Sequence, residues 1–421
     1  RNSSAASDVY KRQDKTMGKL VGLKGIRILD LSVGIAGPFA SQILGDLGAE
    51  IIKIEQPGLG DIARGAAPQL QGESFYHLAV NRNKKSVELD LSTDLGKTAL
   101  HDLSRISDAV LDNYRPGVLK RLGAEYETLR AINPMIVSCT ITGYGDSGPY
   151  CQYPAFDDMA EGISGVYSMS GESEKRPVRL PVPIADLAAG VFAAIAILFG
   201  VIQREKVGAG CKLSVSLLDA VMFLLETNFQ TYFITGEAPR PRGRRHPISP
   251  MVGIFETKNG HIVLGPSWPR IARLIGKEWM MHDPRFSTVE ARFKNKDDLE
   301  DLIEEGLREA DSEDWLELMH AEDVAAGPLN TLEKAIQDPQ VIHNKTVVIL
   351  RHPLCGEVRN IECPIRLERT ETIGHSPPPL LGQHTDEVLR DLLGYSDEQI
   401  TRLKEQETAN RELKRPVRRR L

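Results

Sequence analysis

The sequence predicts an α/β fold built on a large parallel sheet. One observation is a strand–loop–helix–strand unit: residues 25–31 (GIRILDL) are apolar, 39–47 have helical periodicity, and 50–54 (EIIKI) are apolar again. The other is that the strand-like runs at 109–112 and 135–142 each end in a polar or glycine-rich loop. Strands that alternate with helices in this way are typical of a parallel sheet with helical crossovers.

The composition is that of an ordinary globular protein. Of the 421 residues, 41% are hydrophobic and 26% are charged, so the chain can bury a large core. The length predicts two or three domains. A net charge of −6 gives no reason to expect nucleic acid or an anionic membrane as a partner, and we expect neither.

The cysteines indicate a reducing compartment. There are five, spread along the chain without a Cys-x-x-Cys pair. This spacing argues against both a zinc site and a disulfide framework. We therefore expect a cytoplasmic protein that holds no metal.

Both ends of the chain differ from the rest. Residues 1–16 show no periodicity, and we expect a non-native or disordered leader with Met17 as the native start. Residues 414–421 (KRPVRRRL) are basic, and we expect a disordered tail.

A single carboxylate precedes the most apolar stretch of the chain. Asp186 is followed by sixteen residues without a charge, 187–202, which predict a helix buried all round. The stretch is shorter than the roughly 20 residues that a membrane span needs. At the helix start, Asp186 could be an N-cap, which this feature alone favours, or a nucleophile.

The loop at 32–38 (SVGIAGP) contains two glycines between the first strand and helix. It departs from the dinucleotide pattern G-x-G-x-x-G, and Pro38 removes an N–H group from the helix start. Gly34 and Gly37 could form only a tight turn, or the loop backbone could approach a nucleotide-bearing ligand without that pattern.

A basic cluster precedes the strand expected at 86–91. Arg82, Lys84 and Lys85 could meet phosphates, although such a cluster is more often a solvated face. We expect Ser92 to cap the helix that follows, up to about residue 106.

The second half predicts a smaller α+β region. Residues 213–235 read as an amphipathic helix, and 236–250, rich in Pro, Arg and Gly, read as a linker. A hairpin with an Asn259-Gly260 turn follows. We expect helices at 268–275, 297–308, 312–321 and 397–413.

Taken in order, the motifs resemble the class III CoA-transferases, also called the CaiB/BaiF family. They are GIRILDL with AGP (25–38), DLGAEIIKIE (46–55), NRNKKSVELDL (81–91), DNYRPGVLKRLG (112–123), TGYG (142–145) and PIADLAAG (183–190). Similar segments continue at 246–250, 326–329 and 378–389, so the resemblance covers nearly all of 24–403.

The resemblance implies a Rossmann-like large domain, a small α+β domain and a homodimer of interlocked rings. On that pattern we divide the chain into the CoA-binding part at 17–235, the linker and small domain at 236–331, and a return segment at 332–413.

The resemblance also implies an activity. Family members move CoA from an acyl-CoA donor to a small carboxylic acid, and their essential aspartate falls on Asp186. It would form an aspartyl anhydride and then an aspartyl-CoA thioester, with CoA thioester as substrate and no tightly bound cofactor. The family's CoA contacts fall on Ile35, Ala36, Leu89, Asp90, Asn113, Tyr114, Arg115 and Arg121. Phe156 and Asp157 would lie in the substrate pocket.

Some positions depart from relatives within the family. The racemase branch has a proton-carrying His where this chain has Phe156, which argues against racemase chemistry. A binding-only paralogue is the other alternative, and the presence of Asp186 argues against it. Gln56 replaces an Arg of some members, and 236–253 lacks the glycine run of formyl-CoA transferases, so oxalate is not the expected substrate.

Two further features have no assigned role. The arginines of 240–245 could meet a dicarboxylate acceptor or belong to a solvated linker. Cys211 stands where the family usually has Gln, and a lone Cys is usually structural.

Overall fold

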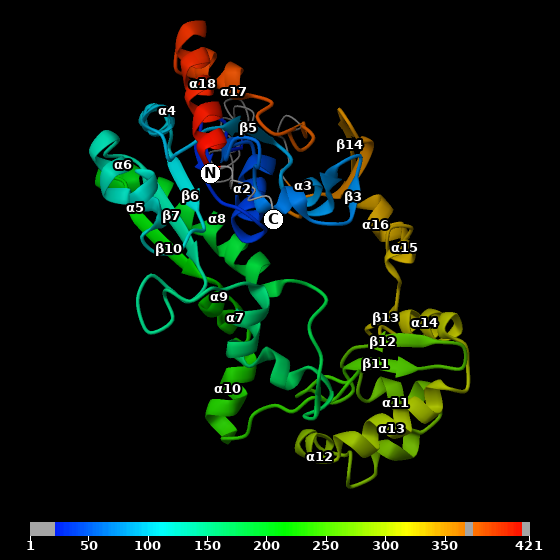
Figure 1. The fold of residues 1–421 in the computed structure, drawn as a ribbon. Coiled ribbons are helices and arrows are strands. Elements are labelled where there is room, and N and C mark those ends of the chain that lie inside the picture. Colours follow the sequence, from blue (N-terminus) through cyan, green and yellow to red (C-terminus); the bar gives the residue numbers. More distant parts are fainter. Residues whose placement is uncertain (1–21, 367–373, 415–421) are drawn as a thin grey trace, which may run out of the picture. The chain divides into compact units, whose positions relative to one another are not determined.

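The computed structural model describes residues 22–366 and 374–414 (Figure 1). The expected leader at 1–16 and the basic tail from 415 onwards lie outside the described residues. The described chain forms two compact units. The first comprises residues 22–160, 184–221, 345–366 and 374–414, and the second comprises 161–183 and 222–344.

A six-stranded sheet forms the centre of the first unit. Every neighbouring pair of strands is parallel, in the order β10-β7-β6-β1-β2-β5. This confirms the predicted parallel α/β sheet. The strands are β1 (Arg27–Asp30), β2 (Glu50–Glu55), β5 (Lys84–Glu88), β6 (Ala109–Asp112), β7 (Val137–Thr142) and β10 (Lys212–Ser216).

Each face of this sheet is covered by helices. Alternate strand residues enter different cores, so Ile28 packs with α2 (Ala36–Asp46) and α8 (Ile184–Val207). Its neighbour Leu29 packs with the other core, to which α4 (Asp94–Arg105), α6 (Tyr126–Ile132) and α18 (Asp397–Lys414) contribute.

The remaining elements of the first unit are short. They are η1 (Ile62–Gly65), β3 (Gln69–Leu70), β4 (Glu73–Ser74), α3 (Phe75–Val80), α5 (Val118–Leu122), α9 (Leu217–Leu224), β14 (Val347–His352), β15 (Gly356–Ile361), α17 (Thr385–Glu387) and the π-helical turn η4 (Val388–Leu392). Helix α7 (Asp157–Ser164) begins in this unit and ends in the second, and α9 likewise continues into the second unit from residue 222.

Helix α8 is not buried all round, contrary to the prediction. One face packs on the sheet core, whereas Val191, Ile195, Phe199 and Ile202 are 42–58% exposed. By length and composition alone α8 could also cross a membrane, a test that core helices pass as well. This apolar face of α8 is therefore exposed among the residues that the structure describes.

Two local predictions were wrong. Residues 213–216 belong to strand β10, which pairs with β7, and helical structure begins only with α9 and continues in α10 (Glu226–Thr235). The cap of α4 is Thr93, whose hydroxyl accepts the N–H of Gly96 at 3.0 Å, rather than Ser92.

The second unit contains a three-stranded antiparallel sheet. Strands β11 (Gly253–Glu256) and β12 (His261–Leu264) form the predicted hairpin, and β13 (Ala326–Pro328) pairs with β12. Its core is built with α11 (Arg270–Leu274), α13 (Lys296–Leu307) and α14 (Ser312–Ala321). The unit also contains η2 (Val166–Met169), β8 (Gly171–Ser173), β9 (Arg176–Pro177), α10, η3 (Glu278–Met281), α12 (Val289–Lys294), α15 (Leu332–Ala335) and α16 (Pro339–His343).

The expected small domain, 236–331, lies inside the second unit. The second unit also contains 161–183 and 222–235, which were predicted to belong to the large domain. It contains 332–344 as well, which were predicted to belong to the return segment.

Candidate functional site

A pocket of about 250 Å³ opens where the parallel strands of the first unit end. In α/β sheets, ligands bind at these carboxyl ends. Loops after β1, β2, β5 and β6 form its walls. Its lining residues are Leu31, Ile54, Glu55, Gln56, Leu89, Asp90, Leu91, Ser92, Tyr114 and Leu122.

Buried ionic side chains fix the loop that follows β1, since the Lys53 ammonium donates to the Ser32 carbonyl of this loop at 2.8 Å. Asp30 accepts hydrogen bonds from Ser41 at 2.6 Å and Lys84 at 3.1 Å, and the Lys53 ammonium lies 2.9 Å from Asp61. Burial opposes ionisation of Asp30, yet the charges of Lys53 and Lys84 hold its pKa well below its usual range. Burial is also the largest effect on Lys84 and lowers its pKa to about 8.

Two side chains of the basic cluster, Arg82 and Lys84, are buried and therefore are neither solvated nor open to phosphates. Arg82 is 1% exposed and forms a bidentate pair with Asp46 at 2.9 and 2.6 Å. Lys84 is 3% exposed, whereas Lys85, whose side chain is 32% exposed, lies 3.2 Å from Glu50. Arg82 and Lys84 therefore hold the unit together, because removing one partner of a buried pair leaves an uncompensated charge.

Three of the predicted CoA contacts line the pocket, namely Leu89, Asp90 and Tyr114. Ile35 and Ala36 lie at the start of α2, outside the lining. Asn113 fixes the loop before them: its side chain bonds the N–H and carbonyl groups of residue 33 at 2.9 and 2.7 Å.

Arg115 and Arg121 follow β6 and are exposed. Neither side chain forms an ion pair with any residue in the part of the chain that the structure describes. Unpaired guanidinium groups beside a pocket are suited to bind phosphate oxygens. Gln56 lines the same pocket. At this position the chain therefore offers an uncharged amide to a ligand, in place of the Arg that the family resemblance implies for some members.

A carboxyl group lies at the end of β6, just before the loop that carries Tyr114 and Arg115. Asp112 is fully buried and accepts hydrogen bonds from Thr140 at 2.7 Å and from the N–H of Tyr114 at 3.1 Å. Burial raises the pKa of Asp112 to about 7, despite these hydrogen bonds. Sequence reasoning did not single out Asp112, because nothing local distinguishes it from other aspartates at strand ends.

Asp186 is the third residue of α8 and is half-buried. The N–H groups of Ala185 and Asp186 donate to one carboxylate oxygen of Asp157, at 2.9 and 3.1 Å. The cap interpretation of Asp186 is therefore wrong, since Asp157 caps the helix. Asp157 is buried, and Phe156 beside it is 64% exposed.

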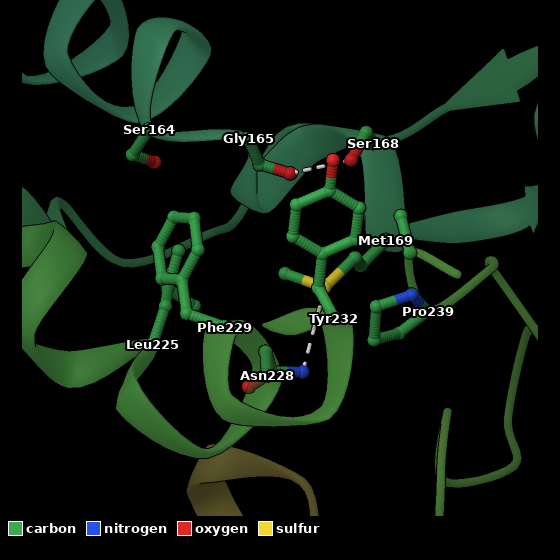
Figure 2. Close-up of a pocket in the computed structure, with 10 residues that line it drawn as sticks. Ser164, Gly165, Ser168, Met169, Leu225, Asn228, Phe229, Tyr232 and Pro239 are labelled. Atoms are coloured by element: carbon green, nitrogen blue, oxygen red, sulfur yellow. Dashed lines mark hydrogen bonds between the residues drawn. The ribbon is translucent and has the colours of Figure 1, made fainter. Parts of the chain in front are cut away.

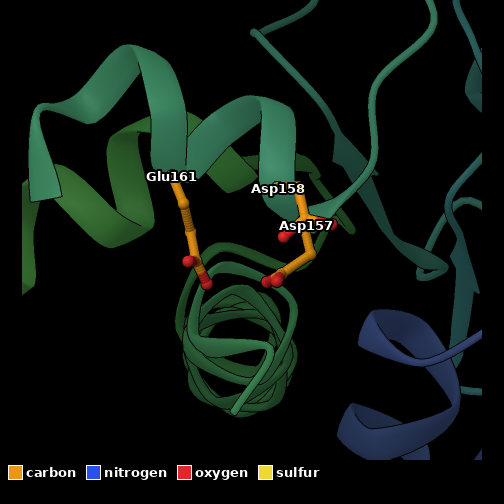
Figure 3. A group of neighbouring side chains, drawn as sticks. All are labelled: Asp157, Asp158 and Glu161. Atoms are coloured by element: carbon orange, nitrogen blue, oxygen red, sulfur yellow. The ribbon is translucent and has the colours of Figure 1, made fainter. Parts of the chain in front are cut away.

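Helix α7 begins with a group of acidic side chains. Figure 3 shows that Asp157, Asp158 and Glu161 all project from this helix. Carboxylates are ligands for hard cations. Acidic residues alone do not make a metal site, however, and one of the three already caps α8.

A more apolar pocket, of about 180 Å³, lies within the second unit (Figure 2). Phe229 and Tyr232 of α10 line it together with Met169, whose sulfur accepts a hydrogen bond from the Asn228 amide at 3.4 Å. The other lining residues are Ser164, Gly165, Ser168, Leu225, Ala238 and Pro239.

The arginines of 240–245 are mostly bound to acidic side chains of α13. Arg242 lies 2.7 Å from Glu300, and Arg244 and Arg245 lie 2.5 and 2.6 Å from Glu304. These three arginines therefore belong neither to a solvated linker nor to a dicarboxylate site, the two alternatives that the sequence left open. Arg240 differs, since it is largely exposed and lies 3.4 Å from Glu174.

Comparison with known proteins supplies the identification. The model of CoA-transferase family III matches residues 23–385. The chain belongs to this family. Human succinyl-CoA:glutarate CoA-transferase is 35% identical to this class III CoA-transferase over 397 residues, 93% of this chain and 91% of the relative.

Other relatives and solved structures agree with this membership. Formyl-CoA:oxalate CoA-transferase of Streptomyces avermitilis is 32% identical, with 91% of this chain and 98% of the relative covered. A CAIB/BAIF family protein from Brucella suis has a similar structure, with a TM-score of 0.76 at 29% identity over 88% of this chain and 99% of that one. An aspartate-to-alanine mutant of a Mycobacterium tuberculosis protein gives a TM-score of 0.78 at 28% identity, over 88% of this chain and 99% of that one.

Proposed function

We propose that this class III CoA-transferase carries CoA from an acyl-CoA donor to a carboxylic acid through Asp186. The observation that carries the proposal is the place of Asp186 in the first turn of α8. The helix dipole favours an ionised carboxylate there. Because Asp157 caps the helix, Asp186 is not needed as the cap.

The reaction proceeds through two kinds of covalent intermediate. The Asp186 carboxylate attacks the donor thioester carbonyl, which gives a mixed anhydride and releases CoA thiolate. The thiolate attacks the aspartyl carbonyl of the anhydride, the donor acid leaves, and an aspartyl-CoA thioester forms. The acceptor carboxylate attacks this thioester to give a second anhydride and thiolate. Attack of the thiolate on the acceptor's acyl carbonyl yields the product and restores Asp186.

We place the nucleotide part of CoA in the pocket at the strand ends. Leu89, Asp90 and Tyr114 line it, and the exposed guanidinium groups of Arg115 and Arg121 follow the same strand-end loop. CoA arrives as a thioester substrate and leaves as one, so the protein needs no tightly bound cofactor.

For the acyl groups, we propose small dicarboxylates, with succinyl-CoA as donor. The support comes from relatives named for succinate and glutarate in human and in Agrobacterium fabrum, the latter 32% identical over 88% of this chain and 95% of the relative. The lack of a glycine run in 236–253 argues against the formyl-CoA lid.

We further propose that the protein works as a homodimer, as the family resemblance implies. The uncovered apolar residues of α8, from Val191 to Ile202, support a second copy as the partner. A helix face with several exposed large apolar side chains commonly marks an interface. Light scattering is expected to give twice the mass of one chain, and a monomer at micromolar concentration would contradict this part.

Mass spectrometry of the intact protein tests the mechanism. Incubation with succinyl-CoA should give an adduct that hydroxylamine converts to a hydroxamate at Asp186. Asp186→Asn, which keeps the shape, should give no adduct and lose transfer by at least about a thousandfold, because the nucleophile is gone. An adduct at another residue, or CoA transfer by Asp186→Asn, would contradict the mechanism. Exchange of the α-proton with deuterium without transfer would instead favour a racemase.

A further inference from the structure

The C-terminal helix α18 holds one wall of the pocket at the strand ends. One carboxylate oxygen of Glu407 accepts the N–H of Asp90 at 2.9 Å. One turn further on, the Asn410 amide donates to the Asp90 carboxylate and to the Ser92 hydroxyl, the latter at 2.9 Å. Asp90, Leu91 and Ser92 all line the pocket, so α18 contacts the pocket wall from behind.

The contact between Glu407 and the pocket wall is buried and specific. Glu407 is 6% exposed, although it lies on a helix whose surface is otherwise largely polar and open. Burial is the main effect that raises the pKa of Glu407 to about 7; the charges of Glu88 and Asp90 act in the same direction, and Lys404 opposes them. A carboxylate placed against two others costs free energy, because like charges repel at short range. An apolar residue at position 407 could pack here without this repulsion. The carboxyl group is therefore explained better by its hydrogen bond to the Asp90 N–H than by packing.

We propose that Glu407 and Asn410 are positioning residues that hold Asp90–Ser92 in the shape that binds acyl-CoA. The inference rests on the proposed function, since it takes this pocket as the CoA site. Neither residue needs to touch CoA. If the wall is ordered only part of the time, the apparent affinity falls by the fraction of molecules in the binding shape.

Calorimetric titration with free CoA tests this role without any chemical step. Glu407→Ala and Asn410→Ala should each raise the dissociation constant about five- to tenfold, the effect of one or two lost hydrogen bonds. Glu407→Gln keeps an acceptor oxygen and should restore most of the affinity. Glu405→Ala, an exposed position on the same helix, is the matched control and should bind as the wild type does.

Steady-state kinetics supply the second readout. The KM for succinyl-CoA should rise in both alanine variants, while kcat and the kcat/KM for the acceptor stay within about twofold, a split that general destabilisation would not produce. Circular dichroism establishes that each variant is folded. Should Glu407→Ala fail to fold, the more peripheral Asn410→Ala still decides the outcome.

The possible failures are distinguishable. If the wild type binds and transfers CoA but folded alanine variants bind it equally well, only the positioning role is overturned. An equal loss in Glu405→Ala overturns it too, because the effect would then be unspecific. A wild-type protein that binds no CoA overturns the proposed function and the positioning role together.

Discussion

Replacing Asp157 by alanine tests whether the cap of α8 also sets the reactivity of Asp186. Two N–H groups of the first turn, at 2.9 and 3.1 Å, share one oxygen of this buried carboxylate. A lost cap costs about 0.5–2 kcal/mol, and burial with two bonds places this one near the upper end, at about 2 kcal/mol. Asp157→Asn retains an acceptor oxygen and should cost about 0.5 kcal/mol.

The same change should reach the chemistry, because one of the two N–H groups belongs to Asp186 itself. A displacement of about 1 Å in a reacting group lowers rates by about a hundredfold, so we expect kcat to fall about ten- to a hundredfold in Asp157→Ala. Urea unfolding followed by circular dichroism measures the stability change, and initial rates with succinyl-CoA measure kcat.

Asp158→Ala is the control for this experiment, since that side chain is exposed on the same helix turn. It should change the free energy of unfolding by less than about 0.5 kcal/mol. The reasoning is refuted if Asp157→Ala is as stable and as active as the wild type, or if Asp158→Ala matches its loss.

The remaining predictions concern phosphate binding, acid stability and helix packing. Arg115→Ala with Arg121→Ala should raise the KM for acyl-CoA about tenfold or more and weaken its salt dependence. Glu55 is buried, which alone would raise its pKa, but hydrogen bonding and charge from Arg64 lower that pKa to about 2. The stabilisation lost in Glu55→Gln should therefore be largest above pH 4.5 and fade towards pH 2, as acid unfolding would show. Gly190→Ala places a methyl group 2.7 Å from a carbonyl oxygen of α2 and should destabilise by about 1–3 kcal/mol in urea.

Each of these has an outcome that contradicts it. An unchanged KM in the double arginine variant would show that Arg115 and Arg121 do not bind the CoA phosphates. A Glu55→Gln difference that stays constant down to pH 2 would remove the ion pair as its cause. Gly162→Ala, where nothing lies within 4 Å of the added methyl group, is the control for Gly190→Ala. Equal effects of the two glycine variants would contradict the packing argument.

The sequence predicted the sheet well because its strands carry their own signal. Runs such as 25–31 and 50–54 are buried on both faces, and a continuous apolar run is what such strands require. The strand β10 was missed because 212–216 alternates with polar residues and merges into the helix that follows.

Partners distant in the sequence explain the other misses. The apolar pattern of α8 cannot distinguish a side chain packed on its own chain from one left uncovered, so Phe199 looked like core. Arg82 resembles a surface residue until Asp46, 36 positions away, is known to lie beside it. Glu407 acts on a residue 317 positions earlier, a relation that no local pattern contains.

The hydrogen bonds between β5 and residues 384–385 affect how the chain folds during synthesis. The N–H of His384 donates to the Ser86 carbonyl at 2.9 Å, and Glu88 donates to the Thr385 hydroxyl at 3.0 Å. About 300 residues separate the two sides, which ribosomes need roughly 15–60 s to add. During that interval the outer edge of β5 stays unpaired, the kind of edge that draws other chains into aggregates. A nascent chain that stalls before His384 therefore presents an open sheet edge, and truncated chains that end there should aggregate more readily than the full chain.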